Sequence, residues 1–213
     1  MKNLIFLGFF LLLLISCKEE KEAEEKREVA TYSIEQFMDN EAVFGGSFSP
    51  DNSRLLVTSN RSGIFNMYTV PTSGGEFTPV TDSDSSSVYA ISFFPNDDRI
   101  LFRMDNNGDE VYKIFVKDGD SIERLTPAEN ARALFYGWTK AGDAFYYGSN
   151  ERDPRYTDIY KMDLESFTPE LLYENSEAYD FGGVSPNGRF IALTKSINTN
   201  DSNLFLYDTE QDS

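Results

Sequence analysis

The chain has 213 residues, with 36 acidic against 19 basic side chains and no histidine, which gives a formal net charge of −17. This length suffices for one or two domains. Because there is no basic patch to hold phosphates, the sequence argues against nucleic acid as a partner, and without histidine these residues cannot assemble a Ser-His-Asp triad.

The N-terminus has the features of a secretory signal. Lys2 gives a positive start, and the apolar run from Leu4 to Ile15 has twelve residues, short of the roughly 20 that a membrane-spanning helix needs. The run ends in LISC, which resembles the lipobox of bacterial lipoproteins, whose cysteine is acylated and becomes the mature N-terminus. A lone cysteine is more often a small buried hydrophobe, but Cys17 is the only cysteine and its position favours lipidation.

We therefore expect a signal peptide over residues 1–16 and a lipid anchor at Cys17. Residues 17–30 then form a charged tether, because the run KEEKEAEEKRE after Cys17 has no apolar face to bury. Its acidic residues resemble the surface-export signal of lipoproteins in the Bacteroidetes. The expected location is the cell envelope, as an outer-membrane lipoprotein on either the periplasmic or the exposed side.

After the tether, a block of about 45 residues occurs four times. The turn positions Pro50, Pro95, Lys140 and Pro186 are 45, 45 and 46 residues apart. A second set of anchors, on a later strand, is 47, 45 and 45 residues apart: Tyr68, Phe115, Tyr160 and Phe205. This period with short strands is typical of a β-propeller, whose blades cover one another's faces. A β-sandwich with evenly spaced strands is the alternative, but two independent anchors favour the propeller.

Each copy predicts four strands. In the first copy the turn at Pro50 leads into the apolar strand Leu55-Leu56-Val57, and a polar loop separates it from the strand NMYTV. A short strand ending at Val80-Thr81 follows, and another begins at Val88. We therefore expect an all-β fold: a partial β-propeller over residues 31–213, with four visible four-stranded blades of about 45 residues starting near residues 48, 93, 138 and 184.

Few residues suggest a site. The charged loop with Glu151, Arg152, Asp153 and Arg155 is a candidate for facing a substrate chamber, although such a run is more often a solvated loop. Residues 105–109 superficially resemble a calcium loop but lack the bidentate glutamate of an EF-hand, so a polar turn is expected there. Trp138 stands where other copies have Phe or Val and is expected in the core. No cofactor and no metal is predicted.

The repeat resembles known blades. The string from Phe48 to Thr81 is similar to the F-S-P-D-G, S-N-R-x-G and D-I-Y blade of TolB-like proteins and of prolyl oligopeptidase family propellers, and the third copy repeats Ser149-Asn150 and Asp158-Ile159-Tyr160. The resemblance covers residues 31–209. The lead-in YSIEQFM, followed by FGGSFSP, most resembles secreted serine peptidases of the prolyl oligopeptidase family.

That resemblance implies an α/β-hydrolase domain after the propeller, with a serine in G-x-S-x-G followed by Asp and His. Neither that string nor a histidine occurs here, and no match is found to the glutamate pair by which dipeptidyl peptidases hold the substrate amino terminus. No catalytic residue is therefore assigned to this chain.

We therefore expect the substrate-gating and scaffold portion of a secreted, lipid-anchored prolyl oligopeptidase-like serine peptidase. It should be inert without the missing hydrolase domain, with that domain, a peptide substrate and the membrane as partners. Since such propellers have seven or eight blades, the chain is expected to be truncated, with wetted apolar strands at Leu55-Leu56-Val57 and Ile191-Ala192-Leu193. The alternative is a stand-alone TolB-like envelope lipoprotein that binds a protein or glycan partner.

Overall fold

The computed structural model describes residues 29–213. The predicted signal peptide, Cys17 and the tether up to residue 28 lie outside the described residues. Residues 29 and 30 are exposed and have no regular structure. The first regular element within the described residues is the helix α2 (Ile34–Met38), whose N-terminus is closed by a capping box between Ser33 and Gln36. In the described part, no helix is long and apolar enough to cross a membrane.

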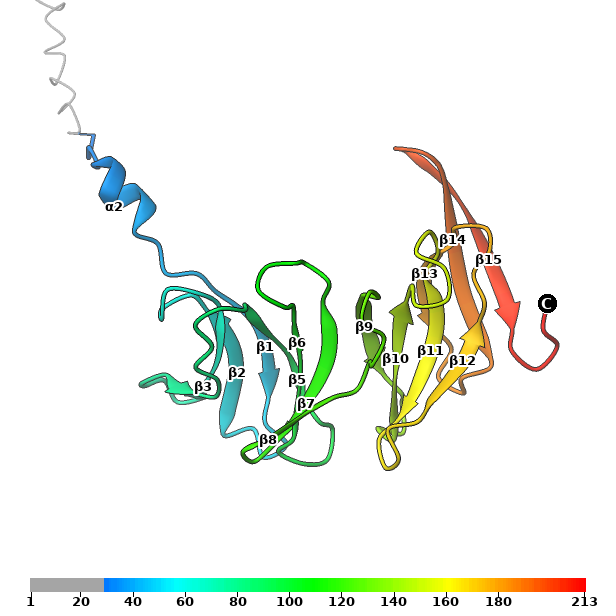
Figure 1. The fold of residues 1–213 in the computed structure, drawn as a ribbon, viewed down its shortest axis with the longest axis horizontal. Coiled ribbons are helices and arrows are strands. Elements are labelled where there is room, and N and C mark those ends of the chain that lie inside the picture. The colour runs from blue at the N-terminus through cyan, green and yellow to red at the C-terminus, as the bar shows by residue number, and fades with distance from the viewer. Residues whose placement is uncertain (1–28) are drawn as a thin grey trace, which may run out of the picture. The chain divides into compact units, whose positions relative to one another are not determined.

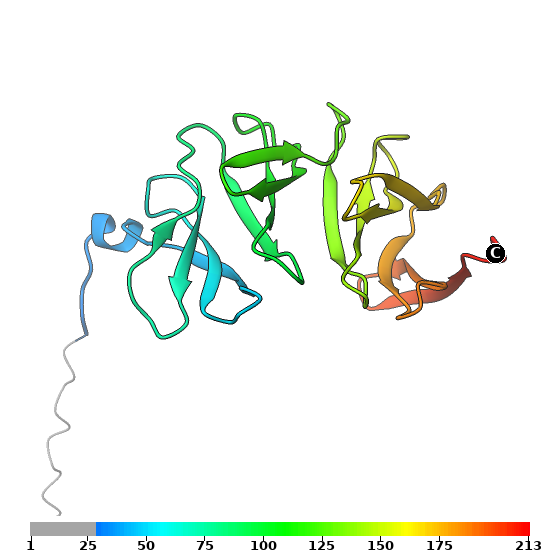
Figure 2. The same ribbon diagram turned by 90° about the horizontal axis from the view of Figure 1, so that it is seen from below.

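Residues 29–40 and residues Glu41–Ser213 belong to two separate compact units. The second unit consists of four antiparallel sheets that follow one another along the chain (Figures 1 and 2). Blade 1 contains β1 (Val43–Phe48), β2 (Arg54–Ser59), β3 (Asn66–Pro71) and β4 (Thr78–Pro79). Blade 2 contains β5 (Val88–Phe93), β6 (Ile100–Met104), β7 (Lys113–Asp118) and β8 (Ser121–Arg124). Blade 3 contains β9 (Ala133–Trp138), β10 (Ala144–Ser149), β11 (Asp158–Asp163) and β12 (Pro169–Tyr173).

Blade 4 has three strands within the described residues. They are β13 (Asp180–Val184), β14 (Phe190–Asn198) and β15 (Asp201–Asp208). In each blade the strands pair with their neighbours in chain order. The predicted all-β partial propeller is confirmed, with the difference that the fourth sheet shows three strands instead of four.

The blades begin one strand earlier than the repeat boundaries taken from the turns. The repeat pattern assigns Val88–Phe93 to the first copy. This strand pairs with β6 in the structure and is therefore the first strand of blade 2. The sheets accordingly start at residues 43, 88, 133 and 180 rather than near 48, 93, 138 and 184. The physical reason is that a repeat has a period but no intrinsic starting point, and only strand pairing defines which strands share a sheet.

The turn between the first two strands of a blade is held by side-chain hydrogen bonds. In blade 1, Ser49 Oγ donates to Asp51 Oδ1 at 2.6 Å, and the same carboxylate oxygen accepts from the backbone N–H of Ser53 at 3.0 Å. The third copy has no proline here, yet Thr139 Oγ1 donates to Asp143 Oδ1 at 2.7 Å and closes a comparable turn. The hydroxyl–carboxylate bond therefore holds the turn with or without the proline.

The apolar core lies between neighbouring blades. Separate clusters of buried side chains join blade 1 to blade 2, blade 2 to blade 3 and blade 3 to blade 4. The largest includes Phe94 and Leu101 from blade 2 together with Phe145 and Met162 from blade 3. Trp138 packs against this cluster, with its ring centroid 5.2 Å from that of Phe94, so its predicted core position is confirmed.

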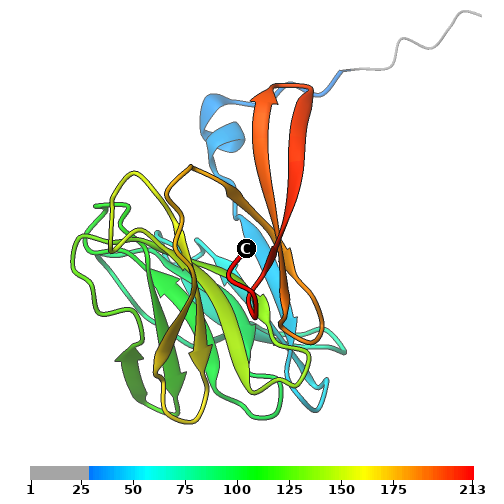
Figure 3. The same ribbon diagram turned by 90° about the vertical axis from the view of Figure 1, so that its right-hand side faces the viewer.

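The exposed apolar side chains of the first and fourth blades are not the ones predicted from the sequence. Leu56, Val57, Ile191 and Leu193 are all buried. Leu56 packs against blade 2, and Ile191 and Leu193 pack against blade 3. The exposed large apolar side chains of blade 4 are instead Leu204, Phe205 and Leu206 on β15 and Ile197 near the end of β14. The two strands form a long hairpin that projects beyond the other strands (Figure 3).

Candidate functional site

The loop between β10 and β11 carries the four charged residues singled out in the sequence. Arg152 forms a bidentate pair with Asp158, with both Nε–Oδ2 and Nη2–Oδ1 at 2.7 Å, and its Nη2 also donates to the carbonyl of Asn175 at 2.6 Å. Asp158 is fully buried. Hydrogen bonding to this carboxylate holds the pKa of Arg152 above its ordinary value. Arg152 therefore ties the loop to the end of its own blade.

The other three charged residues of this loop are also engaged within the chain. Arg155 forms a second bidentate pair with Asp153, at 3.0 and 2.7 Å, and its hydrogen bonds lower the pKa of Asp153 to about 2. Burial, followed by the charge of Glu151 and a hydrogen bond with it, raises the pKa of the Tyr160 hydroxyl. The Arg155 side chain is 74% exposed, so it is the most open to solvent of the paired side chains in this loop. A role toward a substrate stays a prediction.

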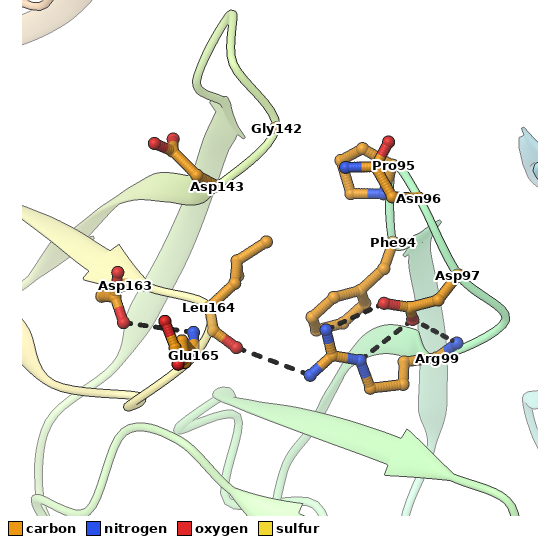
Figure 4. A pocket seen from close by; sticks show the side chains of 10 residues that line it. All are labelled: Phe94, Pro95, Asn96, Asp97, Arg99, Gly142, Asp143, Asp163, Leu164 and Glu165. Carbon is orange, nitrogen blue, oxygen red and sulfur yellow. Dashed lines mark hydrogen bonds and ion pairs between the residues drawn. The ribbon is translucent and has the colours of Figure 1, made fainter.

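A crevice of about 450 Å³ lies where a turn of blade 2 meets turns of blade 3 (Figure 4). Its basic group is Arg99, which binds Asp97 through Nε and Nη2 at 2.9 Å each and donates to the carbonyl of Leu164 at 3.5 Å. The guanidinium also stacks on the ring of Phe94, with 4.3 Å between its carbon and the ring centroid. Arg99 thereby links the two blades.

The carboxylates of this crevice are mostly occupied. Asp143 accepts from Thr139, and Asp163 caps the backbone N–H groups of Glu165 and Ser166. A second crevice of about 300 Å³ lies between strand residues of blade 3, such as Tyr146 and Lys161, and the turn of blade 4 at Asn187 and Arg189. Because crevices lie at two successive contacts between blades, we interpret them as a consequence of blade packing. Sequence reasoning missed the crevice, although acidic turn residues in consecutive copies were a visible signal.

The described residues show no assembled catalytic or metal centre. Among residues 29–213, no group of three or more His, Cys, Asp or Glu side chains is placed to hold a metal ion. Residues 105–109 form the predicted polar turn, in which Asp109 Oδ1 accepts from the backbone of Asn106 and Val111. The complete sequence has no histidine, so a Ser-His-Asp triad requires residues from outside this chain.

Comparison with known proteins identifies the repeat. The family model for the prolyl oligopeptidase N-terminal β-propeller domain matches residues 80–213, more than half of the chain. Among curated proteins, dipeptidyl aminopeptidase BIII of Pseudoxanthomonas mexicana is 28% identical over 146 residues, which cover 63% of this chain and 21% of that protein. The chain thus spans about one fifth of the length of this relative.

Solved structures share the fold. TolB from Acinetobacter baumannii superimposes with a TM-score of 0.58 at 20% identity, covering 81% of this chain and 42% of TolB. Oligopeptidase B from Leishmania major gives a TM-score of 0.56 at 13% identity, covering 80% of this chain and 25% of the peptidase. At these identities the likeness establishes the propeller architecture and carries no functional assignment.

Proposed function

The chain belongs to the family of prolyl oligopeptidase N-terminal β-propeller domains, and we propose that it is the propeller portion of a secreted, lipid-anchored serine peptidase. In this role it gates the approach of peptide substrates and supports an α/β-hydrolase domain that supplies the nucleophile. The observation that carries the proposal is the family match over residues 80–213, which spans blades 2 to 4. The propeller itself is proposed to be catalytically inert.

The family match favours this role over that of a TolB-like binding protein. TolB and the peptidases superimpose about equally well, so the fold does not separate the two roles. The relative with significant sequence similarity is a dipeptidyl aminopeptidase. The missing histidine agrees with a division of labour in which the catalytic groups lie on another domain.

Labelling with a fluorophosphonate probe tests the peptidase proposal. The full-length protein purified from its source should be labelled on one serine outside residues 1–213, and mass spectrometry of the peptides locates the label. The 213-residue chain expressed alone should remain unlabelled and should not cleave dipeptide anilide substrates. Absence of label from the full-length protein would favour the TolB-like binding role, whereas label within residues 1–213 would contradict an inert propeller.

The lipid anchor is a separate part of the proposal. It is supported by the short apolar run before Cys17 and by the absence of a second cysteine. Metabolic incorporation of a fatty-acid probe should label the wild-type protein and place it in the membrane fraction, and Cys17→Ser should abolish both. Unchanged labelling and fractionation of Cys17→Ser would exclude Cys17 as the anchor.

A further inference from the structure

Blades 1 and 3 close one of their ends with a pair of polar residues at equivalent positions. The first is an asparagine directly after the second strand. Asn60 Oδ1 accepts from the backbone N–H of Ala42 at 2.7 Å, and Asn150 Oδ1 accepts from that of Arg132 at 2.9 Å. Each bond ties the loop after the second strand to the residue before the first strand of the same blade. The asparagine is therefore a structural element of the repeat.

The second polar residue begins the third strand, opposite the last residue of the second strand. This position holds Asn66 in blade 1 and Asp158 in blade 3, and both are fully buried. Asn66 bonds to both the carbonyl and the N–H of Ser83, and Asp158 accepts from the N–H of Asn175 at 2.8 Å. The loop that follows the fourth strand is thereby drawn over the end of the blade.

Blade 2 replaces both residues with charged ones. Asp105 stands at the asparagine position and Lys113 at the Asn66 position, opposite Met104, and each residue is only 6% exposed. Asp105 Oδ2 accepts from the N–H of Glu110 at 3.3 Å, but Oδ1 is buried without a hydrogen-bond partner. The Lys113 ammonium donates to the carbonyl of Val111 at 3.4 Å, and within residues 29–213 no ion pair joins it to Asp105.

Both charged groups line a cavity of about 460 Å³. Met104 and Phe115 contribute apolar surface to its wall, and Arg124 stands beside Glu129 in an ion pair of 2.9 Å. A buried polar atom without a hydrogen-bond partner is costly, and Asp105 Oδ1 is such an atom. The charge of Lys113 is partly balanced by Asp109 and Glu129 in the same cavity, whose pKa values it helps to lower. The cavity thus presents one carboxylate oxygen without a donor, an ammonium group that has a single long hydrogen bond, and an apolar surface.

We propose that this cavity in blade 2 binds a free amino acid with an apolar side chain. The ligand's ammonium group pairs with Asp105 Oδ1, its carboxylate pairs with Lys113, and its side chain rests on Met104 and Phe115. A metal ion fits poorly because Lys113 and Arg124 share the cavity, and a simple anion fits poorly because Asp105 and Glu129 do. A zwitterion satisfies both charges at once.

Titration calorimetry on the whole chain with three related compounds tests the proposal. L-leucine carries both charges, L-leucinamide lacks the carboxylate, and 4-methylpentanoate lacks the ammonium group. Saturable binding of L-leucine at least tenfold tighter than that of either analogue is expected. No saturable binding of L-leucine up to about 10 mM, well into the millimolar range of weak ligands, overturns the proposal, as does equal binding of L-leucinamide.

Two variants introduce the residue that another blade carries at the equivalent position, so we expect both to fold. Asp105→Asn restores the residue of blades 1 and 3, and Lys113→Asn restores that of blade 1. Each should melt at or above the wild-type temperature while weakening L-leucine binding at least tenfold. Glu165→Gln, in the crevice between blades 2 and 3, is the matched control and should bind as the wild type does. Undiminished binding by either folded blade 2 variant overturns the assignment.

Discussion

Asp158 shows how one buried charge organises a loop that its sequence suggests is merely solvated. Its carboxylate is fully buried and accepts from Arg152 and from the backbone of Asn175, so three chain segments meet at one residue. A buried charge is tolerated here because it is paired with Arg152 and both carboxylate oxygens accept hydrogen bonds. The neighbouring Arg155 faces solvent and binds only within its own turn.

Removing the Asp158 carboxylate should therefore destabilise the fold. Asp158→Ala is expected to lower the free energy of unfolding by about 3 kcal/mol, because it breaks a buried, hydrogen-bonded ion pair. Asp158→Asn should recover much of this loss, since asparagine occupies the equivalent place at Asn66. Urea unfolding measures all three proteins. Arg155→Ala is the control and should be neutral; a loss equal to that of Asp158→Ala would assign the effect to the loop in general.

Asp51 should contribute an acid-dependent part of the stability. Hydrogen bonds from Ser49 and Ser53 lower its pKa to about 2, below the ordinary value of 3.8. A group whose pKa is lower in the folded state stabilises the fold above its unfolded pKa, and that stabilisation is lost as pH falls toward the folded value. The contribution of Asp51 to the free energy of unfolding should therefore be lost as the pH falls from about 4 to about 2.

Asp51→Asn tests this dependence. Blade 4 has Asn187 at the same turn position, where Ser185 donates to it at 2.7 Å, so the variant should fold normally. The urea midpoint of the wild type should fall more steeply between pH 4 and pH 2 than that of Asp51→Asn, and the two proteins should differ least at the acid end. Identical pH profiles would show that the turn hydrogen bonds do not depend on the carboxylate charge.

At the scale of elements, the strands follow from local residue patterns, whereas their grouping does not. The turn, the apolar run and the second strand of each copy are visible because each is encoded within a few neighbouring residues. The residue at which each blade begins is not visible in the sequence. The pattern of Val88–Phe93 fits the last strand of blade 1 as well as the first strand of blade 2, and only its pairing with β6 assigns it to blade 2. Similarly, the role of Arg152 depends on Asn175, which lies 23 residues further along the chain.

The packing between blades 3 and 4 requires a glycine in β10, Gly148. Tyr136 stacks on Phe181, with ring centroids 4.0 Å apart and planes 5° apart, and burial raises the pKa of its hydroxyl to about 12. This ring lies over Gly148 in β10. A Cβ at Gly148 would meet the Tyr136 hydroxyl and would stand 2.6 Å from Thr157 Cγ2. The requirement for glycine is therefore steric and does not come from the backbone conformation, because Gly148 is not in the left-handed region.

Gly148→Ala should accordingly lower the free energy of unfolding by about 1–3 kcal/mol, the usual cost of overpacking a filled core. The matched control is Gly46→Ala in β1, where the added Cβ would make an ordinary contact of 3.7 Å with Leu55 Cδ1. That variant should be neutral or slightly stabilising, because alanine restricts the unfolded chain. Equal effects of the two substitutions, measured by urea unfolding, would contradict a steric role for Gly148.

At the scale of the whole molecule, the described residues leave an apolar strand uncovered. Leu204 and Leu206 on β15 are 74% and 65% exposed, although the partner strand β14 buries Ile191 and Leu193 against blade 3. Within residues 29–213, β15 pairs with β14 alone, so its other edge is free. An exposed edge strand with apolar side chains is a template for pairing with another chain.

Residues 31–213 expressed alone, without the predicted signal and tether, should therefore associate at micromolar concentration or be poorly soluble. Leu204→Lys combined with Leu206→Lys should shift the population toward monomer, because charged side chains block edge-to-edge pairing. Ile122→Lys in β8 is the control, since Ile122 is also 50% exposed but lies in a different blade. Light scattering across a concentration series distinguishes the species. A wild-type chain that stays monomeric and monodisperse, and unfolds in one cooperative calorimetric transition, would show that β15 does not drive association.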